Sequence, residues 1–116
     1  MNTRELLRWQ WEGYTQYHQS RANLLLHIVV VPLFLIGNVG LVVALVNGAI
    51  VPALVSLVAM VISMAVQGRG HGIEVVPSVP FSSRTNAISR IFLEQWVTFP
   101  RFVLSGGWWR ALRKAG

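Results

Sequence analysis

The chain has no cysteine, so it can form neither a disulfide framework nor a metal site built on thiolates. It is also poor in charge: Asp, Glu, Lys and Arg together make up 12% of its 116 residues, about half of their share in an average soluble domain. From Ala22 to Gly68 there is no residue of these four types. Because each helix of a small soluble bundle needs a polar face, this long uncharged stretch favours an integral membrane protein.

Acidic residues are scarcer than basic ones, and the formal net charge is +6. A basic surface can indicate nucleic-acid binding. Here the basic residues flank a long apolar run, a pattern that more often meets anionic lipid headgroups. We therefore expect membrane lipids, and no nucleic acid, as partners.

The uncharged stretch divides at Asn47-Gly48, a dipeptide suited to a tight turn. Residues 24–46 and 50–67 on either side are long enough to cross a bilayer as helices. Small residues at close-packing spacing, Gly40 with Ala44 and Ala59 with Ser63, would let the two helices approach. The sequence thus predicts an all-α fold: a helical hairpin of two membrane spans.

All ten basic residues lie outside this hairpin on its open side, and the turn has none. The positive-inside rule then places both termini in the cytoplasm. We expect the inner (plasma) membrane of a bacterium.

The remaining segments flank the hairpin on its open side within one membrane domain. Residues 1–21 are predicted to form an amphipathic helix and a turn, with Leu7, Trp11, Tyr14 and His18 on one face. Residues 68–84 are expected to be a polar loop. Residues 85–114 are predicted to form an amphipathic segment at the membrane interface, with Phe99 on its apolar stripe. Pro100 is expected to interrupt this segment. Glu12 and Glu94 are expected to be solvated.

The chain has only three histidines, and each lies near a predicted membrane boundary. His18 and His27 would point to opposite sides of one continuous helix. A helix start capped by Asn23 would break that helix and let the two imidazoles face each other. The hairpin brings His71 back to the same depth.

Three imidazoles and the carboxylate of Glu74 could together bind a divalent metal of the iron or zinc type. His27 is the strongest indication, because ionisable groups inside a membrane span are costly and usually functional. Interfacial histidines can also merely face headgroups or form structural hydrogen bonds. The spacing by itself leaves these alternatives open.

The order of these residues resembles a family of small membrane proteins, formerly of unknown function. That family includes a fungal endoplasmic-reticulum 2-hydroxy fatty acid dioxygenase of phytosphingosine breakdown. The similarity spans roughly residues 14 to 80 and is carried by Tyr17-His18, Asn23, His27, Pro32, the apolar hairpin and Gln67-x-x-Gly70-His71-x-x-Glu74-x-x-Pro77.

The resemblance implies a non-heme, Fe(2+)-dependent dioxygenase for α-oxidation of 2-hydroxy fatty acids or related lipids, with dioxygen as the second substrate. By the same resemblance, His18, His27 and His71 are expected to be catalytic metal ligands.

The residues around these ligands suggest further roles. Asn23 and Gln67 are candidates for hydrogen bonds behind the ligands, and Arg21 or Arg69 could attract the carboxylate of a lipid substrate. Two other functions stay open: a non-enzymatic lipid-binding or assembly factor with structural histidines, and a haem-binding hairpin. The sequence also leaves a homo-oligomer open.

Overall fold

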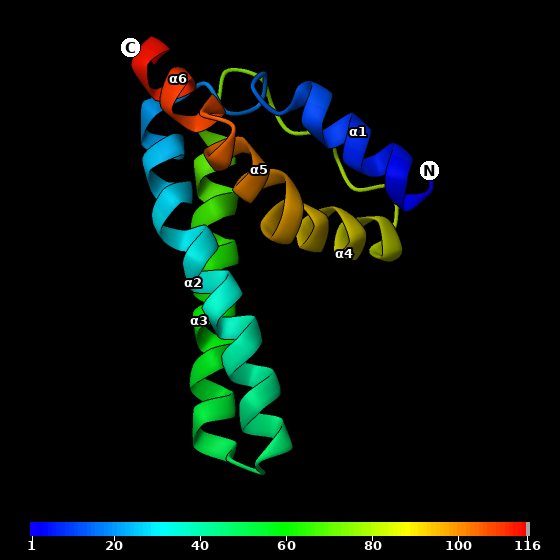
Figure 1. Cartoon of the computed structure of the whole chain (residues 1–116), viewed down its shortest axis with the longest axis vertical. Coiled ribbons are helices and arrows are strands. Elements are labelled where there is room, and N and C mark those ends of the chain that lie inside the picture. Colours follow the sequence, from blue (N-terminus) through cyan, green and yellow to red (C-terminus); the bar gives the residue numbers. More distant parts are fainter. Residues whose placement is uncertain (116) are drawn as a thin grey trace.

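The computed structural model describes residues 1–115, and Figure 1 shows their arrangement. Within this range the chain is helical and has no strands, which confirms the predicted all-α class. A long hairpin of two helices carries the other helices at its open end, where both termini also lie. The helices are α1 (Thr3–Gly13), α2 (Arg21–Val46), α3 (Ile50–Gly72), α4 (Arg84–Leu93), the π-helix η1 (Glu94–Thr98), α5 (Phe99–Leu104) and α6 (Gly107–Lys114).

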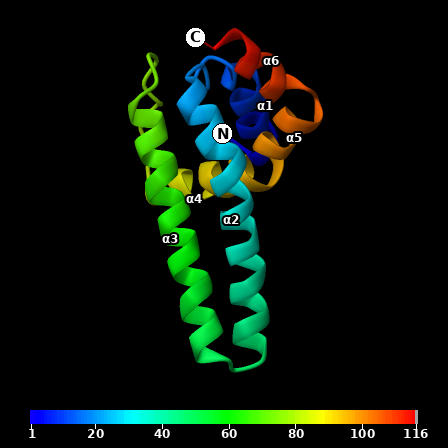
Figure 2. The same ribbon diagram turned by 90° about the vertical axis from the view of Figure 1, so that its left-hand side faces the viewer.

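The hairpin consists of α2 and α3, which run side by side in both views (Figures 1 and 2). Asn47 ends α2, and Gly48 follows with φ of +64°, a left-handed conformation that glycine adopts without steric cost. Both helices are long and apolar enough to cross a membrane. Only 28% of the apolar window of α2 and 17% of that of α3 is buried within the chain, so most of each helix presents aliphatic side chains outward.

Glycines let the two helices approach closely. A Cβ on Gly37 would lie 2.7 Å from Met60 Cγ, and one on Gly40 would lie 2.6 Å from Ser56 Oγ. The close contact predicted at Gly40 is therefore confirmed. Ser63, also expected at this interface, is buried, and its hydroxyl donates a hydrogen bond to the carbonyl of Val30.

The first span begins earlier than expected. Ser20, and not Asn23, caps α2, because its hydroxyl accepts a hydrogen bond from the amide of Asn23. The second span also differs: α3 continues through His71 to Gly72, so the start of the expected loop 68–84 is helical. This extension keeps His71 on a rigid element.

Helix α1 packs against the helices that follow the hairpin. Asn2 caps it by accepting a hydrogen bond from the amide of Glu5. Tyr14 and His18 of the predicted face are buried, but within α1 the buried residues are Leu6 and Gln10, one position away from the predicted Leu7 and Trp11. The shift has a polar cause: the side chain of Gln10 accepts a hydrogen bond from Thr98 and donates one to the carbonyl of Arg90.

The segment from α4 to α5 stays helical through Pro100, contrary to the expected interruption. The wider turns of η1 end at Thr98, and Pro100, which has no backbone N–H to donate, lies in the first turn of α5, where that N–H is not needed. One face of the segment buries Gln95, Thr98 and Phe99. Apolar side chains elsewhere on the segment are partly exposed; they include Ile88, Phe92 and Trp96.

Candidate metal centre and adjoining cavity

The three histidines meet where α2 and α3 reach the open end of the hairpin. His18 lies in the turn after α1, His27 in α2 and His71 in α3. Their ring centroids are 5.1 Å (His18–His27), 4.9 Å (His18–His71) and 5.0 Å (His27–His71) apart, with the rings nearly perpendicular to one another. Segments far apart in the sequence thus form a compact triangle of imidazoles.

Backbone carbonyls fix two of these rings. His18 Nδ1 lies 2.8 Å from the carbonyl oxygen of Tyr14, and His27 Nδ1 lies 3.0 Å from that of Asn23. A carbonyl oxygen can only accept, so each Nδ1 carries the proton and donates. The lone pair of each neutral ring is therefore on Nε2, the nitrogen that a metal would bind.

Three other nitrogens of these imidazoles are buried and have no hydrogen-bond partner among the described residues. Among the described residues, no hydrogen-bond partner is found for His18 Nε2, His27 Nε2 or His71 Nδ1. His27 is completely buried and His18 is 2% exposed. Buried polar atoms are nearly always hydrogen-bonded, so three orphaned imidazole nitrogens in one place call for a ligand.

The carboxylate in this group is that of Glu94, from the start of η1. One ligand atom from each of His18, His27, His71 and Glu94 lies within 4.8 Å of all the others. Glu94 Oε2 lies 3.5 Å from His18 Nε2, and the side chain is 20% exposed. Glu94 is thus half-buried, whereas the sequence predicted that it would be solvated.

The charge state of Glu94 suits a metal ligand. Burial acts to raise the pKa of this carboxyl, but when the imidazoles are protonated a hydrogen bond from His18 and the positive charges of His18, His27 and His71 lower the pKa to about 2. The carboxyl is therefore ionised at neutral pH, as metal ligands must be.

Tyr14 supports the carboxylate from behind. Its hydroxyl donates a 2.8 Å hydrogen bond to Glu94 Oε2, and its ring stacks on His18 with centroids 3.9 Å apart. Burial and the charge of Glu94 raise the pKa of the Tyr14 phenol well above its ordinary value, so it stays a donor. One residue thus orients both Glu94 and His18.

Glu74, the carboxylate expected as a ligand, lies in a different network. It accepts hydrogen bonds from the amides of Gln19 (2.9 Å) and Ser20 (3.1 Å) and from the side chain of Asn23 (2.7 Å). These donors surround the N-terminus of α2, where the helix dipole also favours a negative charge. Glu74 therefore links the end of α3 to the start of α2 and does not belong to the four-residue cluster.

The other expected residues lie at varying distances from the cluster. Asn23 stands directly behind His27, whose proton its carbonyl accepts. Gln67 exchanges a pair of hydrogen bonds with Gln95 and donates one to Ser63, so its amide is held in a separate buried pair. Arg21 is exposed and reaches the carbonyl of Leu112, and Arg69 is exposed on α3.

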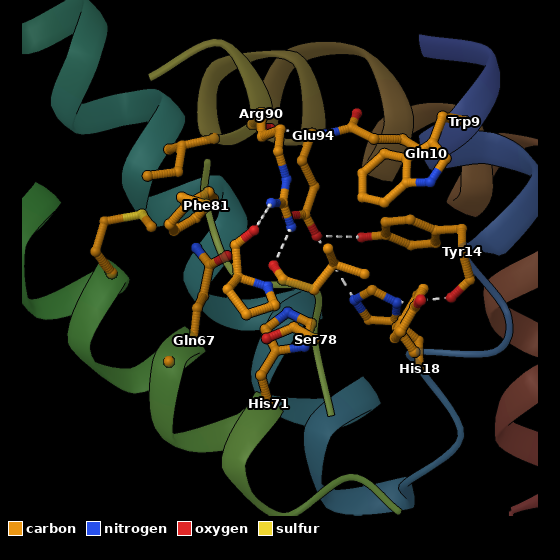
Figure 3. A pocket seen from close by; sticks show the side chains of 16 residues that line it. Trp9, Gln10, Tyr14, His18, Gln67, His71, Ser78, Phe81, Arg90 and Glu94 are labelled. Atoms are coloured by element: carbon orange, nitrogen blue, oxygen red, sulfur yellow. Dashed lines mark hydrogen bonds and ion pairs between the residues drawn. The ribbon is translucent and has the colours of Figure 1, made fainter. Parts of the chain in front are cut away.

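A cavity of about 370 Å³ adjoins the cluster (Figure 3). His18, His71 and Glu94 form part of its wall, and Arg90 lines it as well, whereas Arg21 and Arg69 are not among its described lining residues. The rest of the lining is largely apolar or aromatic and includes Trp9, Tyr17, Met64, Val79, Pro80, Phe81 and Ile91.

Only the tertiary arrangement identifies Glu94 and Arg90 as site residues. Glu94 lies 23 residues beyond His71, in a segment predicted to sit on the membrane surface. The sequence contains one indication of a special role for Glu94: it is one of only four acidic residues, and it follows the apolar run Ile91-Phe92-Leu93.

The donor set fits a divalent metal. Three neutral imidazoles and one carboxylate, without sulfur, suit iron(II) or zinc. Ligand atoms about 2.1 Å from a common metal are at most about 4.2 Å apart, so a cluster within 4.8 Å needs only small side-chain movements to close. The second nitrogens of His18 and His27 already donate to carbonyls, as is usual for metal-bound histidines.

Comparison of the chain with models of protein families, with curated proteins and with solved structures finds no match. The function is therefore inferred from the cluster, the cavity and the hairpin that positions them.

Proposed function

We propose that the chain is a membrane-embedded, iron(II)-dependent dioxygenase for α-oxidation of 2-hydroxy fatty acids or related lipids. The observation that carries the proposal is the set of three buried, unpartnered imidazole nitrogens gathered around one ionised carboxylate. The resemblance of the histidine motifs to the dioxygenase family supports the choice of iron and of substrate.

The proposed setting is a membrane. The outward aliphatic surface of α2 and α3 would lie in lipid, with the Asn47-Gly48 turn on the far side. The cluster would then lie at headgroup level, where the polar end of a fatty acid also lies. The ten basic residues favour the cytoplasmic side for this end and for both termini.

Each part of the site has a defined task in this proposal. His18, His27, His71 and Glu94 would hold the metal, and the carbonyls of Tyr14 and Asn23 would keep two of the rings in the ligating tautomer. Bound iron(II) would supply the activation of dioxygen. The apolar cavity walls would exclude bulk water from the reacting carbon atoms.

The overall reaction balances with dioxygen as the only co-reactant. The bond between the carboxyl carbon and the hydroxyl-bearing carbon breaks. The carboxyl carbon leaves as carbon dioxide, and the hydroxyl-bearing carbon becomes the carboxyl group of an acid one carbon shorter. The substrate loses four electrons, which reduce dioxygen, and one water molecule forms.

Two rival functions fit the geometry less well. Two axial histidines of a haem need the plane between them free for the macrocycle, but here a third imidazole and a carboxylate crowd the same centre. Structural histidines in a non-enzymatic membrane protein would be expected to hydrogen-bond their buried nitrogens, and three of these nitrogens have no hydrogen-bond partner among the described residues.

Metal analysis of the detergent-purified protein, followed by an oxygen-consumption assay, tests the proposal. We expect one iron per chain, no Soret band, and oxygen uptake with 2-hydroxydodecanoate that yields the acid one carbon shorter by mass spectrometry. Dodecanoate, which lacks the hydroxyl, should react far more slowly. A filled metal site that produces no shortened acid would refute the dioxygenase.

Variants of the ligands connect the activity to the site. Replacement of His18, His27 or His71 by alanine should each remove most of the bound iron and the activity. Gln16→Ala, an exposed change close to His18, serves as the control and should keep both. Wild-type iron content in all three histidine variants would exclude the proposed metal centre.

A further inference from the structure

The cavity beside the cluster has an unusual cation in its wall. Arg90 lies one helical turn before Glu94, so both face the same space (Figure 3). Its guanidinium lies over the rings of Trp9 (5.0 Å) and Phe81 (4.4 Å), which hold it between α1 and the segment after α3. Arg90 is half-buried and is not a freely moving surface cation.

Hydrogen bonds hold this guanidinium in place and leave some of its donors free. Nη2 donates to the carbonyl of Val79 (2.8 Å), while Nη1 donates to that of Pro80 (3.2 Å) and to Asn86 Oδ1 (3.5 Å). Among the described residues Nε–H has no acceptor, and Nη2, which carries two protons, has one. Nε and Nη2 form one edge of the guanidinium, and such an edge matches a carboxylate with two parallel hydrogen bonds.

The charges around the cavity also favour an anion. A divalent metal bound by Glu94 and neutral imidazoles would retain a net positive charge, and Arg90 adds a positive charge to the wall of the same cavity. The described lining contains no second carboxylate to neutralise them. A neutral lipid would gain little from these positive charges, whereas a carboxylate would be attracted by both the bound metal and Arg90.

We propose that this cavity binds an acyl-chain carboxylate whose headgroup is held side-on by the Nε–Nη2 edge of Arg90. The first carbons of the chain then lie against the apolar wall formed by residues such as Trp9, Met64 and Ile91. The inference rests on the proposed function and deepens it, because it assigns the substrate's carboxylate to Arg90 in place of Arg21 or Arg69.

A glycine keeps the cavity open on the side of α3. Gly68 lines the cavity, and a Cβ added there would meet no atom within 4 Å. Gly72, one turn further along the same helix, is equally free of contacts but does not line the cavity. A bulky side chain at 68 can therefore be added to the cavity wall without a clash at its Cβ, and the same side chain at 72 is a matched control.

Binding of two radiolabelled probes to the full-length, detergent-purified protein tests the inference. The probes are 2-hydroxydodecanoate and its methyl ester, which differ only in the charge of the headgroup. We expect wild-type protein to bind the acid at least tenfold more tightly than the ester. Arg90→Gln should reduce this preference by weakening acid binding alone, and Arg69→Gln should keep it in full. A preference in Arg90→Gln as large as in the wild type, or its absence in the wild type, would overturn the assignment.

Loss of Arg90 could weaken binding indirectly, by loosening the segment around Val79. Variants of the two glycines test the location of the ligand without changing Arg90. Gly68→Phe should lose binding of both probes at least tenfold while Gly72→Phe binds both normally. Normal binding in Gly68→Phe would mean that the ligand lies elsewhere and would refute the inference.

The two proposals fail in different ways. Arg90-dependent binding without a shortened product would remove the dioxygenase and keep the carboxylate site. A shortened product formed equally well by Arg90→Gln, with an unchanged KM, would keep the dioxygenase and remove the carboxylate site.

Discussion

Replacement of Glu74 by alanine should destabilise the fold without removing a metal ligand. The carboxylate accepts hydrogen bonds from the amides of Gln19 and Ser20 and from the side chain of Asn23, at 2.7–3.1 Å. Glu74 itself is only 8% exposed. Its removal would separate the end of α3 from the start of α2.

The expected magnitude follows from these three contacts. A hydrogen bond to a charged group contributes about 1.5–3 kcal/mol. Gln19 and Ser20 are exposed or half-exposed, so water can replace much of what their amides lose, whereas the Asn23 side chain is fully buried. We therefore expect Glu74→Ala to lower the free energy of unfolding by about 3 kcal/mol in total, the full value of one buried bond with small additions. Glu74→Gln keeps one acceptor oxygen and should lose roughly half as much.

Two measurements on the same preparations check this expectation. Equilibrium unfolding in mixed detergent, followed by circular dichroism, gives the loss of stability. Elemental analysis of the folded fraction should give the wild-type ratio of metal to protein. If Glu74→Gln instead unfolds like the wild type and has lost its metal, Glu74 is a ligand and the reasoning from its hydrogen bonds is refuted.

Three further outcomes are expected. Glu94→Gln should lower metal affinity by at least about tenfold, since even residues that only support ligands have effects of this size. Glu12→Gln, a change at an exposed residue, is the control, and equal metal content in the two variants would contradict Glu94 as a ligand. Gly37→Leu should destabilise the hairpin by about 1–3 kcal/mol in the same unfolding assay, because its Cβ would lie 2.7 Å from Met60 Cγ and 3.0 Å from the backbone oxygen of Ser56. Reporter fusions at the two ends of the chain should both report the cytoplasm, and a signal from the opposite side at either end would exclude the proposed orientation.

Much of the architecture follows from local properties of the chain. The uncharged run, the Asn47-Gly48 turn and the placement of all ten basic residues at one end are visible in the sequence and predict the hairpin directly. Only an α-helix satisfies its own backbone hydrogen bonds over such a length, so an apolar run of this kind leaves little choice of structure. The meeting of His18, His27 and His71 could be expected for the same reason, since a hairpin returns its two ends to one depth.

The tertiary structure alone decided which carboxylate and which cation join the histidines. Glu74 lies closer to His71 in the sequence, but the open amides at the start of α2 hold it. Glu94 and Arg90 reach the site because α4 and η1 fold back against α1 and the open end of the hairpin, an arrangement held by side-chain contacts such as those of Gln10. Spacing along a chain determines which residues share a helix face, but long-range packing determines which faces meet, and no local pattern records that choice.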